Sequence, residues 1–432
     1  MQFQHVVFAA VALGVPASAR AQEWATPIAR DTVLRALVTE ALGSNHSVHE
    51  QEAAVRAAAE RVRPAGALPD PMLSAGVMDL TLPGFALKHS DFTEVDAELA
   101  QEIPWPGTLA ARTRVALAAR SMAQATLDAR RRDVVASVAT SYYRLRYVVT
   151  ALATLRRQHD LLEAAVQLST TRYATGLAPQ TDPLQAKLAR DRLRSEELGL
   201  RADSVAALAT VNALRARGPR DSLLVTPLDP NSLRTQVASA PSPDSLIAAA
   251  LARHPKLAAR RAAMEQATAA IQTERLGGRP DFTLSVRYGY RSAVAGTDLP
   301  DFFSAFVGIR LPIWGGRKQH RLADAARFDS TAAAVGLEDE ELMLGREVTE
   351  TAARLGASRE RLILLADAVL PTARGTVESV LRSYQVGRID FLALLAVEDA
   401  AFRAELEAAA VAADYQTQLV MLRQLTGEEA AP

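Results

Sequence analysis

The chain has 432 residues and balanced charge, with 49 Lys and Arg residues against 49 Asp and Glu residues. This balance argues against a nucleic-acid partner, for which a basic excess is typical, and the absence of cysteine excludes disulfides, thiolate metal sites and a lipid-modified cysteine. Hydrophobic residues make up 49% of the chain but aromatic residues only 5%, a composition that favours long helices or coiled coils over a compact mixed core.

The first segment, residues 1–21, is predicted to be a secretory signal peptide. Residues 6–15 are a short apolar run, and Ala19 and Ala21 form a small-x-small cleavage site before Gln22. The segment before the run lacks Lys and Arg, and the alternative is the start of a buried helix. No later stretch approaches the roughly 18 apolar residues of a membrane-spanning helix. A membrane crossing would therefore need β-strands.

The rest of the chain is predicted to be an internal duplication. Tyr173 and Gly176 recur 211 residues later as Tyr384 and Gly387, and an apolar stripe on the preceding helix recurs in the same register. We expect a first repeat at residues 22–217, a linker rich in Pro, Ser and Asp at 218–243, a second repeat at 244–427 and a tail at 428–432. Each repeat has the order helix, strand pair, long helix, tight turn, long helix.

Each repeat is predicted to contain two strands with one apolar and one polar face. The apolar positions of the second repeat are Phe282, Leu284, Val286, Tyr288, Tyr290, Phe303, Ala305, Val307, Ile309 and Leu311. In the first repeat Val95, Ala97 and Leu99 alternate with acidic residues. Strands of about ten residues have the length that a tilted transmembrane strand requires. A half-buried strand of a soluble sandwich is the alternative.

The predicted helices are too long for a globular domain. Residues 107–175 contain no proline, and at 1.5 Å per residue this stretch spans about 100 Å. The other long helices are expected at about 182–216, 318–383 and 390–425, with a kink at Pro371. Two apolar stripes on each helix indicate neighbours on both sides, which is typical of a ring of helices forming a hollow tube.

Together these motifs resemble the TolC family of outer-membrane efflux proteins, particularly its heavy-metal branch of the CusC and CzcC type. The motifs are LPDPML at 68–73, QEIPWPG at 101–107, YATGLAPQTD at 173–182 and YQVGRID at 384–390. The similarity runs in order from about residue 31 to residue 427.

The resemblance implies a mainly α fold with a small β part. Long coiled-coil-like helices would form a periplasmic α-barrel, and four strands per protomer would enter a trimeric twelve-stranded outer-membrane β-barrel. The expected function is a passive outer-membrane conduit, in contact with lipid, for heavy-metal ions or small toxic compounds. Its partners would be two further copies, a periplasmic adaptor protein and an inner-membrane pump. No cofactor or catalysis is expected.

The two tight turns are expected to be the tips of helical hairpins. Gly176 and Gly387 would end one helix, and Asp182 and Asp390 would cap the next. The resemblance adds that adaptor proteins dock here. The docking residues it implies are Tyr173, Gly176, Leu177, Asp182, Tyr384, Gly387, Arg388 and Asp390.

Two charged features bear on the expected pore. Many family members carry Asp residues where this chain has Ala393 and Ala396, so the resemblance predicts a periplasmic gate that is less charged than usual, with Asp390 left mainly to cap. The proposed lumen residues of the strands are Glu94, Asp96, Glu98, Arg287 and Arg310. Repeated in three copies, the acids would favour cations, and the two arginines would partly offset them.

Other functions are disfavoured by what the motifs lack. His46 and His49 have helical ligand spacing, but no third ligand follows, so no metal site is expected. No nucleophile elbow, phosphate loop or zinc motif occurs, which argues against an exported hydrolase. A periplasmic coiled-coil adaptor or scaffold remains the alternative, and it should have one hairpin between β-rich halves.

Overall fold

The computed structural model describes residues 31–79, 93–229, 241–291 and 299–427; the expected signal peptide, 1–21, lies outside these ranges. The chain divides into two compact units. The first unit comprises residues 31–49, 129–254 and 342–427, and the second comprises 50–128 and 255–341, within the described ranges. Each unit therefore contains segments of both sequence repeats.

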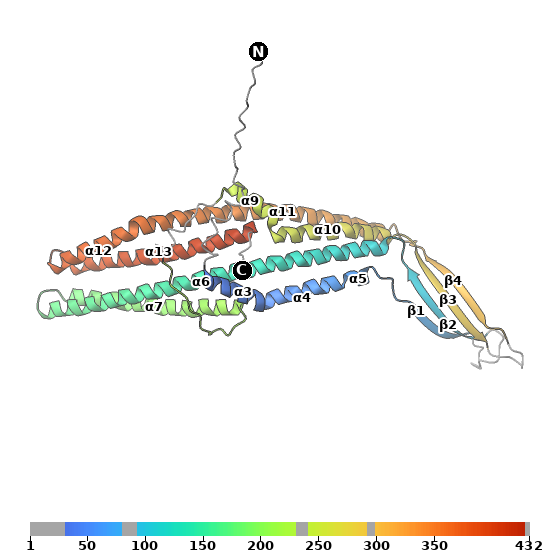
Figure 1. The fold of residues 1–432 in the computed structure, drawn as a ribbon, viewed down its shortest axis with the longest axis horizontal. Helices are drawn as coiled ribbons and strands as arrows, with labels where there is room; N and C mark the ends of the chain where they lie inside the picture. Colours follow the sequence, from blue (N-terminus) through green and yellow to red (C-terminus); the bar gives the residue numbers. More distant parts are fainter. Residues whose placement is uncertain (1–30, 80–92, 230–240, 292–298, 428–432) are drawn as a thin grey trace, which may run out of the picture. The chain divides into compact units, whose positions relative to one another are not determined.

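Two long hairpins dominate the first unit (Figure 1). The first hairpin joins α6 (Thr108–Ala174) to α7 (Thr181–Leu214), and the second joins α12 (Leu370–Gln385) to α13 (Phe391–Thr426). The uninterrupted run without proline is a single helix of 67 residues, as the sequence predicted. Helix α6 extends through both units. Its residues up to 128 belong to the second unit, and its residues from 129 onward belong to the first.

The helix that leads into the second hairpin changes its geometry just before Pro371. The α-helical hydrogen bonds of α11 (Gln319–Leu364) give way to a π-helical turn at Leu365–Val369, and α12 follows. Proline lacks the N–H that would continue the α-helical ladder, and a wider turn accommodates its ring. The kink predicted at Pro371 stays a prediction, and the change that the structure shows is this π-helical turn, which ends two residues before Pro371.

Shorter helices and the start of the linker complete the first unit. They are α3 (Thr32–Ser44), the start of α4 (His46–Glu60) and α9 (Pro243–Arg253). The linker is fastened to α6, since the Leu228 N–H donates to the Thr150 hydroxyl at 2.7 Å and Leu228 is buried. Asp31 caps α3 by accepting from the Leu34 N–H at 3.0 Å.

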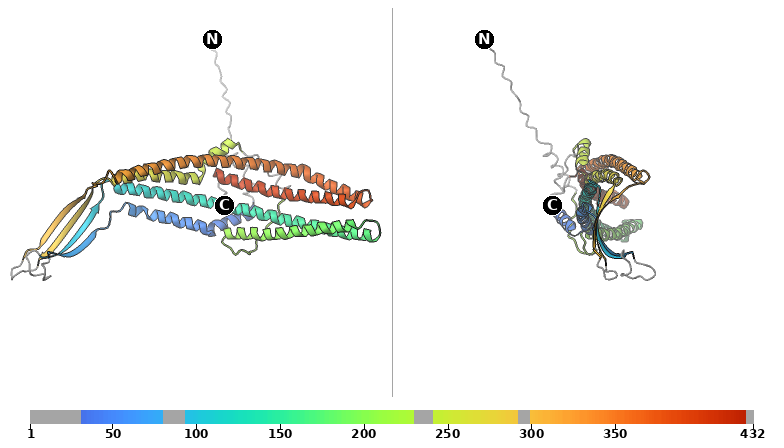
Figure 2. Two further views of the ribbon diagram at one scale, coloured as in Figure 1. Left: turned by 180° about the vertical axis from the view of Figure 1, so that it is seen from behind. Right: turned by 90° about the vertical axis from the view of Figure 1, so that its right-hand side faces the viewer.

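The second unit combines helices with one antiparallel sheet. Its helices are α5 (Val62–Ala65), α10 (Pro255–Leu276) and parts of α4, α6 and α11. The strands β1 (Met72–Met78), β2 (Glu94–Ile103), β3 (Asp281–Arg291) and β4 (Phe302–Arg310) lie in sequence order (Figure 2). The strand pairs predicted in both repeats are therefore present, and β2 and β3 join the repeats within one sheet.

Within the described ranges, no helix is both long enough and apolar enough to cross a membrane.

Candidate functional site

The first hairpin closes through a left-handed glycine. The Gly176 N–H donates to the Tyr173 carbonyl at 3.0 Å, and the Leu177 N–H donates to the Arg172 carbonyl at 2.8 Å. This bond pair is a Schellman motif, which requires a left-handed residue after the helix. Gly176 has φ +71°, a conformation that glycine adopts without a steric cost.

The second hairpin repeats this turn 211 residues later. The Gly387 N–H donates to the Tyr384 carbonyl at 3.0 Å, and the Arg388 N–H donates to the Ser383 carbonyl at 2.9 Å. Gly387 also has φ +71°. The helix ends predicted at both tips are confirmed, and Leu177 and Arg388 project from equivalent, exposed positions.

The helix starts at the two tips differ. Asp390 caps α13 as predicted, because its carboxylate accepts from the Ala393 N–H at 2.9 Å. The prediction that Asp182 caps α7 is wrong. The Asp182 N–H donates to the Pro179 carbonyl at 3.2 Å, so the chain turns earlier and Asp182 lies within the first helical turn. A carboxylate there still interacts favourably with the helix dipole.

An apolar cluster joins the two hairpins next to their tips. Its buried members are Val166 of α6, Ala186 of α7, Tyr384 of α12, and Phe391 and Leu394 of α13. The rings of Tyr384 and Phe391 are 5.8 Å apart, and the Arg172 guanidinium lies 4.9 Å from the Tyr384 ring centre. The cluster fixes the second tip against the first.

The two tip tyrosines have different surroundings although they are repeat equivalents. Tyr384 is 3% exposed, whereas Tyr173 is 45% exposed. The repeated apolar stripe predicted that both tyrosines lie on an apolar edge of their helix. It could not show which of the two edges packs against another helix. The sequence feature that distinguishes the two tips is Phe391. The equivalent region of the first tip has no aromatic residue that could stack on Tyr173.

The predicted gate residues share one exposed edge of α13. Ala393, Ala396 and Ala400 follow helical spacing and are all exposed, whereas Phe391 is buried in the inter-hairpin cluster. The next exposed charges along the helix are Asp399 and Arg403, and Arg403 donates a hydrogen bond to the Asp399 carboxylate. The edge nearest the turn is therefore apolar apart from the capping Asp390.

Glu398 is a half-buried acid on the opposite side of α13. It lies one helical turn from both Leu394 and Phe402, which are buried in the contacts with the first hairpin. Burial raises the pKa of the Glu398 carboxyl above its ordinary value of 4.5. Folding therefore makes this carboxyl harder to ionise than it is in the unfolded chain.

We expect this acid to make stability depend on pH. Because its pKa is raised on folding, the stabilisation that it contributes is complete below pH 4.5 and is lost as the pH rises through the folded-state pKa. Glu398→Gln should remove that loss, as measured by thermal unfolding at pH 5 and pH 8. Glu405→Gln is the control. The Glu405 carboxylate forms an ion pair with Arg157 at 3.0 Å, so its loss should lower stability at both pH 5 and pH 8. An unchanged pH dependence in Glu398→Gln would contradict the assignment.

The five proposed lumen residues share one face of the sheet. Glu94, Asp96 and Glu98 occupy alternate positions of β2, and Glu98 lies opposite Arg287 of β3. In the next pair of strands, Ser304 of β4 lies opposite Arg287 and therefore on the same face of the sheet. Arg310 is an even number of residues further along β4, so its side chain points to that face as well.

Ion pairs on this face involve both arginines. Arg287 lies 3.8 Å from Glu94, and Arg310 lies 2.9 Å from Glu102. Within the described ranges, the other two acids of the proposed lumen set have no ion pair. The arginines therefore neutralise the acidic row of β2 near both of its ends, at Glu94 and Glu102, more than at its centre.

The opposite face of the sheet is apolar and exposed. Its large exposed side chains are Leu73, Val77, Val95, Leu99, Ile103, Leu284, Val286, Tyr288, Tyr290, Phe303, Val307 and Ile309. A sheet with its apolar side chains outside and its charges on the other face is suited to lipid contact outside and water inside.

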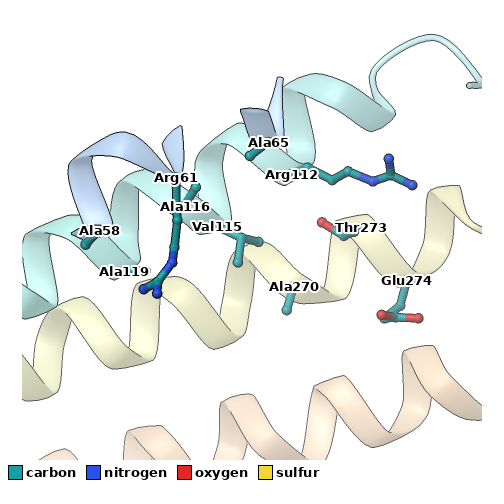
Figure 3. Close-up of a pocket in the computed structure, with 10 residues that line it drawn as sticks. All are labelled: Ala58, Arg61, Ala65, Arg112, Val115, Ala116, Ala119, Ala270, Thr273 and Glu274. Carbon is teal, nitrogen blue, oxygen red and sulfur yellow. The ribbon is translucent and has the colours of Figure 1, made fainter. Parts of the chain in front are cut away.

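A groove of about 480 Å³ in the second unit is lined by residues of α4, α5, α6 and α10, among which alanine is the commonest type. Figure 3 shows the guanidinium groups of Arg61 and Arg112 pointing in different directions, so the polar groups do not converge. No cluster of three or more His, Cys, Asp or Glu side chains suited to a metal occurs in the described part of the chain. His46 and His49 lie in the first turn of α4. The side-chain amide oxygen of Asn45, just before this helix, accepts a hydrogen bond from the Ser47 backbone N–H at 3.0 Å.

Comparison with known families gives one extensive match. The sequence model described as "Outer membrane efflux protein" matches residues 37–216 and 246–428. Two curated relatives are also similar. The cobalt-zinc-cadmium resistance protein CzcC of Cupriavidus metallidurans is 24% identical over 383 residues, 86% of this chain and 84% of the relative. Protein CyaE of Bordetella pertussis is 26% identical over 262 residues, 59% of this chain and 53% of the relative.

Solved structures share the fold at low sequence identity. The outer-membrane channel OprN matches with a TM-score of 0.79 and 19% identity, over 95% of this chain and 93% of that chain. CusC matches with a TM-score of 0.79 and 18% identity, over 93% of both chains. The outer membrane protein VceC of Vibrio cholerae matches with a TM-score of 0.75 and 19% identity, over 91% and 96%.

Proposed function

This chain belongs to the outer membrane efflux protein family, and we propose that three copies of it form the outer-membrane duct of a tripartite export system. The family and the mainly α fold expected from the sequence are confirmed. The alternative of a periplasmic adaptor is not supported, because the described part of the chain contains two long hairpins and one four-stranded sheet instead of one hairpin between β-rich halves.

The observation that carries the proposal is the sheet. Its apolar face is exposed, and β1 and β4 each have only one partner strand within the described ranges. In lipid, unpaired backbone groups cost several kcal/mol each, so a membrane-embedded sheet must close on itself. Four strands are too few to close alone, and closure with further copies in cyclic symmetry satisfies every edge.

The proposal is tested by locating and weighing the mature protein. We expect cleavage before Gln22, recovery in the outer-membrane fraction and a mass of three chains in mild detergent. Membrane fractionation, N-terminal sequencing and light scattering give these results. A soluble monomer would contradict the proposal.

We infer that the hairpin tips receive a periplasmic adaptor, which links the duct to an inner-membrane pump. The exposed tip surface includes Tyr173, Leu177 and Arg388, while Gly176 and Gly387 shape the turns. Neither glycine has an atom within 4 Å of an added Cβ, so a substitution there changes backbone conformation and surface without a steric clash.

Substitution of Gly387 tests this docking role. Gly387→Asp should reduce cross-linking to the adaptor and reduce export, while trimers still form, because an L-residue at φ +71° is strained by about 1–2 kcal/mol only at the tip. Gly375→Ala is the matched control, since Gly375 lies in the middle of α12 and also has open space around it. Normal docking and export in Gly387→Asp would refute the contact role.

The cargo is proposed from the relative CzcC, whose name refers to cobalt, zinc and cadmium resistance. The acidic row of β2 would favour cations in the duct, as electrostatic focusing in a water-filled pore predicts. Passage through such a duct requires no catalysis by the chain. Small toxic compounds are the second class of cargo, and comparative resistance assays of a deletion strain separate the two.

A further inference from the structure

All connections between helices and strands in the second unit lie at the same end of the sheet (Figure 1). α5 leads into β1, β2 leads into α6, α10 leads into β3, and β4 leads into α11. The antiparallel pairing places these strand ends side by side, since Ile103 lies opposite Phe282 and Asp281 lies opposite Arg310. The side chains of the adjoining helix ends therefore gather at one end of the sheet.

Exposed cations are concentrated at these helix ends. We define the basic collar as Arg61, Arg63, Arg112, Arg114, Arg275, Arg279, Arg317, Lys318 and Arg321, all of which are exposed. Within the described ranges none of these side chains forms an ion pair. Farther from the sheet the cations of the same helices are paired: Arg260 of α10 lies 3.1 Å from Glu340, and Arg327 of α11 lies 2.6 Å from Asp324. The collar thus carries positive charge that this part of the chain leaves unpaired.

A stack of side chains connects the apolar face of the sheet to the collar. Phe282 lies on the apolar face, opposite Ile103. The Trp105 ring stacks on Phe282 with ring centres 6.0 Å apart, and the Arg279 guanidinium lies 5.9 Å from the Trp105 ring centre. The order from apolar ring to indole to cation matches the order from acyl chains to interface to charged headgroups in a lipid leaflet.

A second tryptophan lies at the same end of the sheet. Trp314, between β4 and α11, is 70% exposed, and its neighbour Ile313 is 78% exposed. Arg317 and Lys318 follow shortly after it in the chain. Exposed tryptophan is typical of the boundary between a membrane and water, where the ring lies at the level of the headgroups. The collar cations next to Trp314 are therefore expected at headgroup level as well.

We propose that the basic collar binds the phosphate groups of anionic glycerophospholipids in the leaflet on the helix side of the sheet. The inference rests on the proposed function, because it takes the apolar face of the sheet to be embedded in lipid. Arginine pairs with phosphate oxygens through two parallel hydrogen bonds, and its apolar stem can lie along acyl chains while the guanidinium reaches the headgroup. A lipid with net negative charge is favoured over a zwitterionic lipid, whose own cationic group the collar repels.

Quenching of tryptophan fluorescence by lipids with brominated acyl chains tests this proposal. The assembled protein is reconstituted into mixtures of brominated and ordinary lipids, and the quenching gives its affinity for phosphatidylglycerol relative to phosphatidylcholine. The wild type should prefer phosphatidylglycerol by at least about fivefold at low salt, the attraction typical of one cation at a membrane surface. The ratio should fall as added salt screens the charges. Equal affinities for the two lipids would overturn the proposal.

Neutral substitutions locate the preference. The variant that combines Arg317→Gln, Lys318→Gln and Arg321→Gln removes the collar charges next to Trp314, and its ratio should be at least about twofold lower than that of the wild type. The matched control combines Lys187→Gln, Arg192→Gln and Arg194→Gln, which removes the same charges from exposed positions of α7 in the first unit. The control should keep the wild-type ratio. An unchanged ratio in the collar variant, or an equal loss in both variants, would overturn the assignment to the collar.

Two further measurements separate the lipid from a free anion and the collar from the proposed function. Inorganic phosphate at constant ionic strength should leave the ratio unchanged, and loss of the preference would mean that the collar binds free anions instead of lipid. Light scattering of the same samples in mild detergent reports the trimer. Trimers that both lipids quench equally would overturn the collar but leave the duct proposal intact. No quenching by either lipid would show that the sheet is not embedded in lipid and would overturn both.

Discussion

Tyr384→Ala is expected to lower the free energy of unfolding of the first unit by about 3–5 kcal/mol, the range for removing a large buried aromatic side chain. Tyr384 is 3% exposed and contacts Phe391 and the Arg172 guanidinium. The substitution would leave a cavity between the hairpins, and the second tip would lose its main attachment to the first. We therefore expect faster amide hydrogen exchange at both tips as well as a lower denaturation midpoint.

Tyr384→Phe is the matched control for that experiment. The Tyr384 hydroxyl is buried but makes no hydrogen bond within the described residues, so its removal leaves no protein group unpaired. The variant should be within about 1 kcal/mol of the wild type, or slightly more stable. If Tyr384→Phe is as damaging as Tyr384→Ala, the hydroxyl must bind a group from outside this chain, and the packing explanation would fail.

The second large effect is expected at the proposed periplasmic gate. Ala393→Asp combined with Ala396→Asp should convert a weakly cation-blocked channel into a strongly blocked one. In a trimer the double variant adds six carboxylates to one exposed edge that is now apolar. Each close like-charge pair costs about 1 kcal/mol in water and more at lower dielectric, so the ring should gain substantially from a multivalent cation.

Single-channel conductance with a trivalent cation on the periplasmic side measures this effect. We expect at least about a tenfold tighter block of the double variant, equivalent to about 1.4 kcal/mol. The neutral pair Ala393→Asn and Ala396→Asn controls for side-chain size. Tight block of the wild-type channel from that side would mean that the gate lies elsewhere or contains other charges.

Local sequence patterns predicted the regular parts of this fold because each has its own physical cause. The proline-free run predicted α6, and the two-residue alternation predicted the faces of β2, β3 and β4. The glycines at 176 and 387 predicted the ends of two helices, since only a left-handed residue completes that turn.

Features that depend on neighbours could not be predicted in the same way. Asp182 has the residue type and position of a cap, but the hydrogen bond to the Pro179 carbonyl starts the helix earlier. Tyr173 and Tyr384 are equivalent in sequence, and only the packing of α13 against the first hairpin distinguishes them. Arg287 and Arg310 were expected to offset the acids, but their particular partners depend on strand register.

The fused arrangement of the two repeats has a consequence for assembly. The linker between them is fastened to α6 through Leu228 and Thr150, so both repeats of a chain are held at high effective concentration. A tube built from separate single repeats would require six chains to meet, each losing translational and rotational freedom. The duplicated chain would require three in the proposed trimer, and each avoided association would save about 4–15 kcal/mol of that entropic cost. Duplication also frees the two tips to diverge, since they no longer have to be identical for the ring to close.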